Sequence, residues 1–258
     1  IKSLIEKIKG KGTRIVFTEG SDPRILEAAI RLHKEDIVVP VLLGNRAEIA
    51  GAAAANGWDI EGIETLDPIE YKNMDMMVTK VIELRKGKLD EAQAREACLH
   101  RNFFGTMYVK LGCADGLLGG ATYSTADTVR PALQLIKTRP GNSIVSSCFI
   151  LMKDGEENLV MGDCSINIDP SADDLVEITL QTVRQFGIEP RVGLLSYSTL
   201  GSAKGASVAK VNEAATRLKR MPLDFAVEGE VQFDCAVAPE VAKLKAPDSK
   251  VAGNINTF

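Results

Sequence analysis

The stretch TRIVFTEGSDPRILEAAIRLHKEDIVVPVLL, residues 13–43, decides the fold class. Thr13–Thr18 is rich in β-branched residues and predicts a strand. Asp22 and Pro23 then open a helix. The apolar stripe of this helix has helical spacing: Ile25, Ala28, Ala29 and Leu32. Ile37–Leu43 is a continuous apolar run, which is typical of a strand buried on both faces. This order of elements predicts two parallel strands with a helix between them.

The same alternation continues through the first 140 residues. A helix is expected over Ala47–Asn56 and a short strand over Ile63–Leu66. Helical stripes follow over Tyr71–Lys86 and Asp90–Leu111, and another strand candidate over Ala114–Ala121. We therefore predict a parallel sheet with helices on both faces.

The pattern changes after Gly141. Two apolar runs, Ile144–Lys153 and Asn158–Gly162, are joined through Asp154 and Gly155, which is a hairpin signature. Helices and strands then alternate again. These elements are expected at Asp173–Phe186, Val192–Ser198, Ser207–Met221, Phe225–Phe233 and Cys235–Leu244.

The segment Thr138–Asn142 contains Pro and Gly and marks the change of pattern, so we place a domain junction there. The prediction is an α/β protein with two α/β domains, each with three layers and mostly parallel sheets. The first domain covers 1–140 and the second covers 141–251. Residues 252–258 are expected to form a strand that returns toward the first domain.

Composition excludes several classes of protein. The 31 Lys and Arg residues are outnumbered by 35 Asp and Glu residues, which argues against a nucleic-acid binder. The longest apolar runs are shorter than the roughly 20 residues of a membrane span, so no membrane partner is expected. Five cysteines without a C-x-x-C pattern, and only His33 and His100 besides, favour reduced thiols in a cytoplasmic protein without a metal site. Both histidines fall in predicted helical stripes, which indicates structural roles.

The first candidate site follows the strand at Ala114–Ala121. It combines a glycine-rich stretch with three hydroxyls and a cation: Ser124, Thr125, Thr128 and Arg130. Pro131 is expected to be the first residue of a helix, which would leave Arg130 at the helix mouth beside free backbone N–H groups. That arrangement suits an anion, above all phosphate. The alternative is plain capping, because Ser124 and Asp127 form a capping-box pattern that needs no ligand.

The second candidate site is the small-residue loop that follows the apolar run Val192–Leu195. Its polar residues include Ser198, Ser202 and Lys204. Ligands of open α/β sheets bind beyond the carboxyl ends of strands, where this loop is expected. The chain contains neither a Walker A motif nor a G-x-G-x-x-G fingerprint. The alternative is a flexible loop with Ser207 as a helix cap.

Two further features carry weaker signals. Glu228, Glu230 and Asp234 alternate along an expected strand, so their carboxylates could bind a divalent metal or transfer protons. An ordinary polar strand face is the alternative. Arg85 closes the helix at Tyr71–Lys86, where a cation is favourable without any functional role.

Several segments share their order and motifs with a known family. The matching segments are Phe103–Gly116, Gly120–Thr138 with S-T-x-D-T-x-R-P, Leu195–Lys204 with S-Y-S-T-x-G-S-A-K, Glu228–Asp234 and Lys245–Gly253. From end to end, the sequence resembles the phosphate acetyltransferase (phosphotransacetylase) family.

The resemblance implies two α/β domains with an active-site cleft between them, and a homodimer. It implies reversible transfer of an acetyl group between acetyl phosphate and coenzyme A, with CoA, acetyl-CoA and phosphate as substrates and no cofactor. Catalytic roles would fall to Arg130, which holds the phosphoryl group, and to Arg85 in the substrate cleft. Substrate binding would fall to six further residues: Ser124, Thr125 and Thr128 beside the phosphate, and Ser198, Ser202 and Lys204 in the loop of the second domain.

The family continues beyond the segment matching Val251–Phe258. Its further segment supplies the usual thiol base, so we expect the given chain to lack that segment, and the 258 residues alone would then be inactive. Three alternatives remain open at this point. They are an enzyme similar to phosphate butyryltransferase, a non-catalytic paralogue or fragment that binds acyl phosphate or CoA, and a metal- and nicotinamide-dependent dehydrogenase of the isocitrate type.

Overall fold

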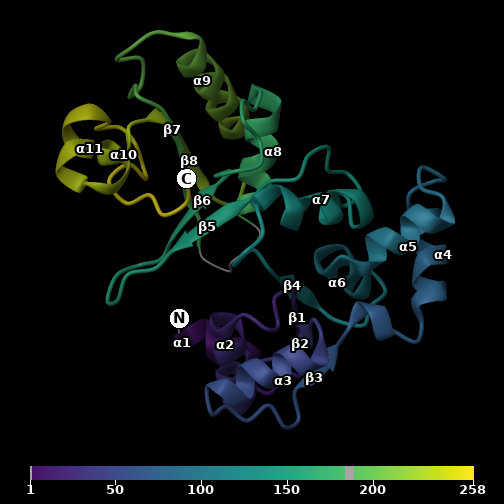
Figure 1. Ribbon diagram of the computed structural model, residues 1–258. Helices are drawn as coiled ribbons and strands as arrows, with labels where there is room; N and C mark the ends of the chain where they lie inside the picture. Colours follow the sequence, from purple (N-terminus) through teal and green to yellow (C-terminus); the bar gives the residue numbers. More distant parts are fainter. Residues whose placement is uncertain (1, 184–188) are drawn as a thin grey trace. The chain divides into compact units, whose positions relative to one another are not determined.

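The computed structural model describes residues 2–183 and 189–258. The chain divides into two compact units, Ile1–Lys137 and Thr138–Phe258 (Figure 1). Within the described ranges, no helix combines the length and the apolar character that crossing a membrane requires.

The first unit is built on a four-stranded parallel sheet in the order β3-β2-β1-β4. Its strands are β1 (Arg14–Phe17), β2 (Val39–Leu43), β3 (Glu64–Leu66) and β4 (Gly116–Leu118). Its helices are α1 (Lys2–Ile8), α2 (Pro23–Lys34), α3 (Arg46–Ala55), the 3-10 turn η1 (Pro68–Glu70), α4 (Met74–Leu84), α5 (Glu91–Leu99), α6 (Arg101–Lys110) and α7 (Thr125–Leu135). The predicted α/β class and the parallel sheet are confirmed.

Helices cover both faces of this sheet because neighbouring strand residues point to opposite sides. On β1, Val16 belongs to the core cluster that includes Phe104 and Met107 of α6. The next residue, Phe17, belongs to a separate cluster that includes Leu26 of α2 and Ile49 of α3. The sheet is therefore the middle of three layers.

Two expected helices are each divided in two. The segment Asp90–Leu111 forms α5 and α6, because His100 has extended backbone angles between them. The segment Cys235–Leu244 overlaps two helices, α10 (Phe233–Val237) and α11 (Pro239–Lys245), which are separated at Ala238. A residue before proline avoids the helical conformation, so this second break follows from Pro239.

The second unit contains a hairpin and a parallel strand pair. The remaining elements are β5 (Cys148–Leu151), β6 (Leu159–Gly162), α8 (Ala172–Thr182), β7 (Arg191–Leu195), α9 (Ala206–Lys219) and β8 (Ala226–Val231). β5 and β6 are antiparallel, as the hairpin signature predicts, and β7 and β8 are parallel. The expected helix at Asp173–Phe186 is seen as α8, and its last residues fall in 184–188, outside the described residues.

Residues 256–258 join the two strand pairs. Thr257 forms parallel bridges with Val160 of β6 and Val192 of β7. The backbone bonds are regular, since the N–H of Val160 donates to the carbonyl of Asn256 and that of Gly193 to Thr257, both at 2.8 Å. α8 and α9 lie side by side against β7 (Figure 1). Residues 256–258 thus complete the sheet of the second unit; a course toward the first domain stays a prediction.

Candidate functional site

The carboxyl ends of β1 and β4 meet at one edge of the first sheet. These strands are parallel neighbours, and the N–H of Thr18 donates to the carbonyl of Leu118 at 3.2 Å. The chain then continues from β1 into Glu19 and from β4 into the loop Gly119–Tyr123. Ligands of α/β sheets bind at such an edge, so it is the natural place for a site.

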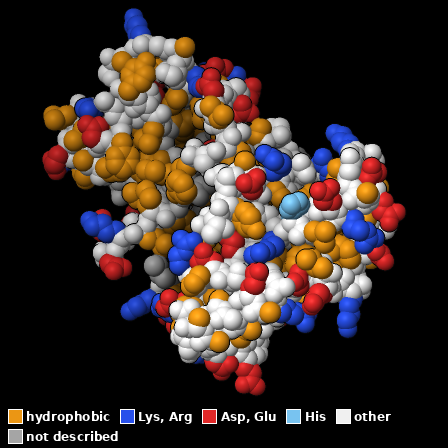
Figure 2. Space-filling view, in the orientation of Figure 1, with side chains coloured by type: hydrophobic (Ala, Val, Ile, Leu, Met, Phe, Trp, Pro, Cys, Tyr) orange, Lys and Arg blue, Asp and Glu red, His pale blue; other side chains and the backbone are white. Residues whose placement is uncertain are grey.

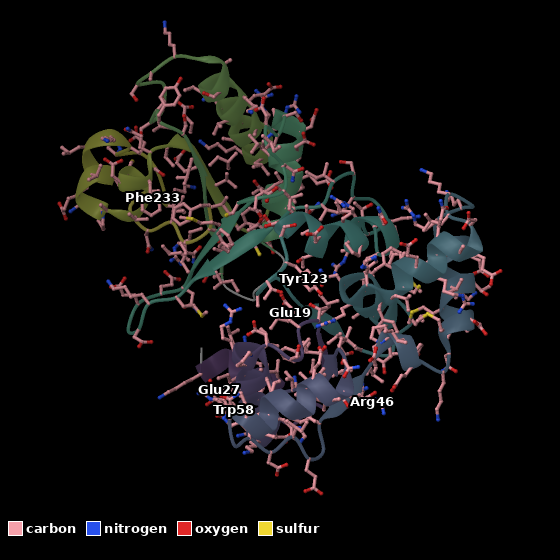
Figure 3. All side chains as sticks on the ribbon, viewed as in Figure 1. Glu19, Glu27, Arg46, Trp58, Tyr123 and Phe233 are labelled. Carbon is pink, nitrogen blue, oxygen red and sulfur yellow. The ribbon has the colours of Figure 1, made fainter. Side chains whose placement is uncertain are left out.

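The glycine-rich loop is wrapped around the carboxylate of Glu19. One oxygen, Oε2, accepts the N–H groups of Gly120 and Ala121, both at 3.0 Å. The other, Oε1, accepts the N–H of Thr122, the Thr122 hydroxyl at 2.7 Å and the N–H of Tyr123 at 3.3 Å. Figure 3 shows Glu19 and Tyr123 close together at this edge. These N–H groups are therefore not available to a phosphate.

The Glu19 side chain is charged in spite of its burial. Only 4% of the residue is exposed. Burial alone would raise the pKa of the carboxyl, but hydrogen bonds from the Thr122 hydroxyl and the loop N–H groups outweigh it and hold the pKa below its usual range. A buried negative charge with five donors is a rigid anchor for the loop.

Helix α7 starts earlier than Pro131, so the expectation that Pro131 opens the helix is wrong. Ser124 is the N-cap: its hydroxyl accepts the N–H of Asp127 at 3.1 Å and donates to the Asp127 carboxylate at 2.6 Å. The capping interpretation therefore describes Ser124. Thr125 is the first helical residue, and Thr128 donates its hydroxyl to the Ser124 carbonyl at 3.1 Å. Arg130 consequently lies in the second turn of the helix and not at its mouth.

A proline inside a helix leaves one carbonyl unpaired, because it has no N–H. For Pro131 that carbonyl belongs to Asp127, four residues earlier. The side-chain amide of Asn102 on α6 donates to this carbonyl at 3.3 Å. Asn102 is buried, and its Oδ1 has no partner in the described part of the chain. The Asn102 amide thus replaces the hydrogen bond that Pro131 cannot form, and it links α6 to α7.

Arg130 lines a cavity of about 360 Å³ between α7 and the start of α6. The lining residues come from the end of α5, from α6 and its N-cap, from the loop and from α7: Ala97, His100, Arg101, Asn102, Phe103, Tyr123, Asp127, Arg130, Pro131 and Gln134. His100 is the N-cap of α6 and supplies no side-chain capping bond within the described residues, so the positive end of the α6 dipole faces this cavity. Arg101 and Arg130 also line the cavity and add positive charge, so the cavity is suited to an anion. Asp127 is the acidic residue of the lining.

Arg85 lies apart from this cavity, whose lining it does not join. It is the C-cap of α4, and its N–H donates to the Val81 carbonyl at 2.9 Å. Its side-chain Nε is buried without a hydrogen-bond partner in the described ranges. The place of Arg85 at the end of α4 agrees with the interpretation as a favourable helix-end charge. Its expected role in the substrate cleft stays a prediction.

In the second unit, the predicted loop is organised by Glu230. This residue is 1% exposed, and its Oε1 accepts the N–H of Gly201 at 2.6 Å and the Ser198 hydroxyl at 3.1 Å. Oε2 accepts the amide of Asn212 at 2.8 Å. Burial would raise the pKa of this carboxyl, but these donors lower it below its usual range. Ser198 is fully buried, and the Ser202 hydroxyl accepts the N–H of Thr199 at 3.0 Å.

Lys204 is the exposed cation of this loop. It lines an open cavity of about 580 Å³ together with Arg217 and Arg220 of the α9 end, and with Glu230. Gly205 is the N-cap of α9 and Ser207 lies within the helix, so the expectation of Ser207 as the cap is wrong.

The three alternating carboxylates do not converge. Glu228 pairs with Lys219, Glu230 binds the loop, and Asp234 lies in α10, where it pairs with Lys245 at 2.8 Å. No group of three or more His, Cys, Asp or Glu side chains able to hold a metal occurs among residues 2–183 and 189–258. The expected strand at Phe225–Phe233 ends at Val231, which separates Asp234 from the other two carboxylates.

Known proteins are similar to this chain over its whole length. A family model described as phosphate acetyl/butaryl transferase matches residues 1–258. The chain belongs to this family. The phosphate acetyltransferase of Bacillus subtilis (strain 168) is 47% identical over 256 residues, which are 98% of this chain and 79% of that protein. That of Staphylococcus epidermidis (strain ATCC 12228 / FDA PCI 1200) is 44% identical, over 99% of this chain and 80% of that protein.

Solved structures of the phosphate acetyl/butaryl transferase family share the fold. A phosphotransacetylase from Streptococcus pyogenes has a TM-score of 0.90 at 45% identity, covering 100% of this chain and 79% of that one. A phosphotransacetylase from Staphylococcus aureus has a TM-score of 0.87 at 42% identity, covering 100% of this chain and 80% of that one. The resemblance seen in the sequence motifs is confirmed.

Sequence reasoning missed three residues of this family member's first unit. Glu19 lies two residues after the end of a buried strand, and an acid near a strand's carboxyl end was a usable signal. Asn102 acts on a carbonyl 25 residues away, which no local pattern reveals. His100 was expected to be structural within a helical stripe, but it breaks that helix and lines the Arg130 cavity.

Proposed function

We propose that this protein catalyses reversible transfer of an acetyl group between acetyl phosphate and coenzyme A. The observation that carries the proposal is the family match over residues 1–258, together with relatives at 42–47% identity that are named phosphate acetyltransferase. The cavity around Arg130 supports it, because a cation and an uncapped helix N-terminus suit a phosphoryl group.

In the direction that forms acetyl-CoA, the CoA sulfur attacks the carbonyl carbon of acetyl phosphate as a thiolate. A bond forms between sulfur and the carbonyl carbon, and the bond from that carbon to the bridging oxygen breaks. The electron pair leaves with inorganic phosphate. The site must stabilise both the oxyanion of the intermediate and the growing charge on phosphate. The thiol proton passes to a base, a role that we assign to none of the described residues.

We assign the phosphate clamp to α7. Arg130 projects from its second turn, and Thr125 and Thr128 lie in its first turn after Ser124. Arginine binds phosphate through paired N–H groups, and its hold strengthens as charge moves onto the leaving group. Ser124 acts mainly by capping the helix, since its hydroxyl is engaged with Asp127. Arg85 is proposed as a second substrate contact.

We assign CoA binding to the loop of the second unit. Lys204 is exposed and suited to a phosphate of CoA, and Ser202 is exposed near it. Ser198 is buried and bonded to Glu230, so its contribution is to the shape of the loop. CoA and acetyl-CoA are substrates, and the reaction as proposed uses no cofactor or metal.

The test is an assay with CoA and acetyl phosphate that follows the absorbance of the thioester. Arg130→Ala should raise the KM for acetyl phosphate and lower kcat, because the clamp acts in both the ground state and the transition state. A hydrogen bond to a charged group contributes about 1.5–3 kcal/mol, so kcat/KM should fall roughly 10- to 150-fold.

The matched control is Arg46→Ala. Arg46 is an exposed arginine of α3 that pairs with Glu70 at 3.7 Å, and Figure 3 places it apart from Tyr123. It should leave kcat/KM within twofold of the wild type. Absence of turnover by a wild-type protein of confirmed full length contradicts the proposed reaction, and an unchanged rate for Arg130→Ala contradicts the clamp.

We also propose a homodimer in the cytoplasm. Figure 2 shows hydrophobic side chains gathered on the surface of the second unit. Phe149, Leu151 and Met152 at β5, and Phe233 on α10, are each more than 40% exposed. A large exposed apolar patch commonly marks a protein interface. Light scattering coupled to size-exclusion chromatography should give twice the chain mass, and a monomer at micromolar concentration would contradict the dimer.

A further inference from the structure

The loop Gly119–Tyr123 is held from one side by a single side chain. Glu19 accepts hydrogen bonds from four consecutive backbone N–H groups, those of residues 120–123, and from the Thr122 hydroxyl. Consecutive N–H groups that converge in this way form a nest of the kind that binds anions. Here the anion is part of the protein itself.

Close packing leaves the loop little freedom to shift. A Cβ added at Gly119 would lie 2.5 Å from the hydroxyl oxygen of Thr18 and 3.4 Å from Oδ1 of Asn102. The loop therefore rests directly against the end of β1 and the start of α6. Glu19 supplies the attraction in this contact, and glycine allows the approach.

The anchored residues lie directly before α7. Tyr123, the last residue bonded to Glu19, lines the Arg130 cavity, and the next residue, Ser124, is the N-cap of the helix. A shift of the loop would move the N-terminus of α7, and with it Thr125, Thr128 and Arg130. Because the loop N–H groups are occupied, a phosphate in this region must be held by side chains of α7 and by α6.

We propose that Glu19 is a positioning residue that fixes the N-terminal turns of α7 in the geometry that binds the phosphate of acetyl phosphate. This proposal rests on the proposed function, because that function makes acetyl phosphate the ligand of α7. Glu19 itself contacts no substrate. In other glycine-rich loops, the backbone N–H groups bind a ligand phosphate. Here the Glu19 carboxylate accepts those N–H groups, so the loop is a fixed support for α7.

Glu19→Gln tests the role with the smallest change in shape. Each carboxylate oxygen accepts at least two backbone N–H groups. Whichever way the glutamine amide turns, its NH₂ group faces two N–H donors, so the loop must move. Thr122→Val is a milder variant, which removes only the hydroxyl donor and keeps the backbone bonds. The matched control is Glu27→Gln, an exposed glutamate on α2 that Figure 3 places apart from Tyr123.

Two binding constants are measured for each variant by calorimetry, those for inorganic phosphate and for CoA, and the two KM values are measured in the assay. For Glu19→Gln, we expect the Kd for phosphate and the KM for acetyl phosphate to rise about tenfold, which corresponds to roughly 1.4 kcal/mol. The constants for CoA should stay within twofold. Thr122→Val should raise the phosphate constants two- to threefold, and Glu27→Gln should leave all four unchanged.

A merely structural role gives a different result, because partial unfolding lowers the active fraction without changing the constants of the molecules that remain folded. Unchanged phosphate constants in Glu19→Gln, or equal changes for phosphate and CoA, overturn the proposal. Should Glu19→Gln fail to fold, Thr122→Val decides in the same way. Phosphate calorimetry needs no turnover. An inactive wild type of confirmed full length that binds phosphate more tightly than its Glu19→Gln variant therefore refutes the proposed function and leaves the positioning role standing.

Discussion

Gly105 of α6 offers a quantitative test of how the helix is seated on the first sheet. A Cβ at this buried position would lie 2.8 Å from Cδ1 of Leu117, and 3.2 Å from both Cδ1 of Leu43 and Cγ1 of Val16. These three side chains come from β4, β2 and β1 in turn. Gly105→Ala therefore pushes the helix against three strands at once.

Two opposing effects set the magnitude. Alanine favours the helix over glycine by about 1 kcal/mol, which stabilises the variant. Overfilling a packed core costs about 1–3 kcal/mol. Leu117 can turn the end of its side chain away, but Val16 and Leu43 are fully buried and cannot move freely. The net expectation is a loss of about 1 kcal/mol of unfolding free energy.

Gly51 on α3 provides the matched control. It is also a helical glycine of the first unit, but it is exposed, and an added Cβ meets no described atom within 4 Å. Gly51→Ala should therefore stabilise by about 1 kcal/mol, so the two variants should differ by about 2 kcal/mol in opposite directions.

The assay is urea unfolding followed by tryptophan fluorescence. Trp58 is the single tryptophan of the chain, and it packs against the core cluster of α2 and α3 (Figure 3), so it reports on the unit that contains both glycines. If Gly105→Ala proves as stable as the wild type or more so, while Gly51→Ala gains stability, the close seating of α6 on the sheet is refuted.

Two further predictions concern ionisable groups. Burial would raise the pKa of Asp163, but the Ser147 hydroxyl and the N–H groups of residues 165–167 lower it, so its stabilisation is present above about pH 4 and is lost as the pH falls. In urea titrations, the stability advantage of the wild type over Asp163→Asn should shrink between pH 6 and about pH 3, and a constant advantage would argue against it. Burial also raises the pKa of the Cys98 thiol to about 11, whereas Cys164 is exposed. Mass mapping after brief iodoacetamide treatment at about pH 8 should find Cys164 modified and Cys98 protected, and equal labelling of the folded protein would contradict that order.

The sequence predicted secondary structure best where an element depends only on residues close to it in the chain. The β-branched run at Thr13–Thr18 and the apolar run at Ile37–Leu43 both form strands of the expected parallel sheet. The hairpin at Asp154 and Gly155 was equally local. In each case hydrophobic periodicity and turn residues act within a few positions, which is the range that a sequence pattern covers.

The site was harder to predict because its contacts are distant in sequence. Pro131 favours a helix start, yet it is accommodated inside α7 because Asn102 bonds to the carbonyl that the proline leaves unpaired. Glu19 lies about 100 residues before the loop that it holds, so the glycine-rich stretch looked free for a ligand. The break at His100 has no proline or glycine to mark it. Such features depend on the packing of the folded chain.

The position of residues 256–258 between β6 and β7 has a consequence for the order of folding. Until these residues are in place, the hairpin β5–β6 and the pair β7–β8 share no strand that joins them. While residues 256–258 are still inside the ribosome, the second unit therefore consists of two separate strand pairs. Because parallel pairing across many residues is slow, insertion of 256–258 should be the step that closes the second unit during synthesis.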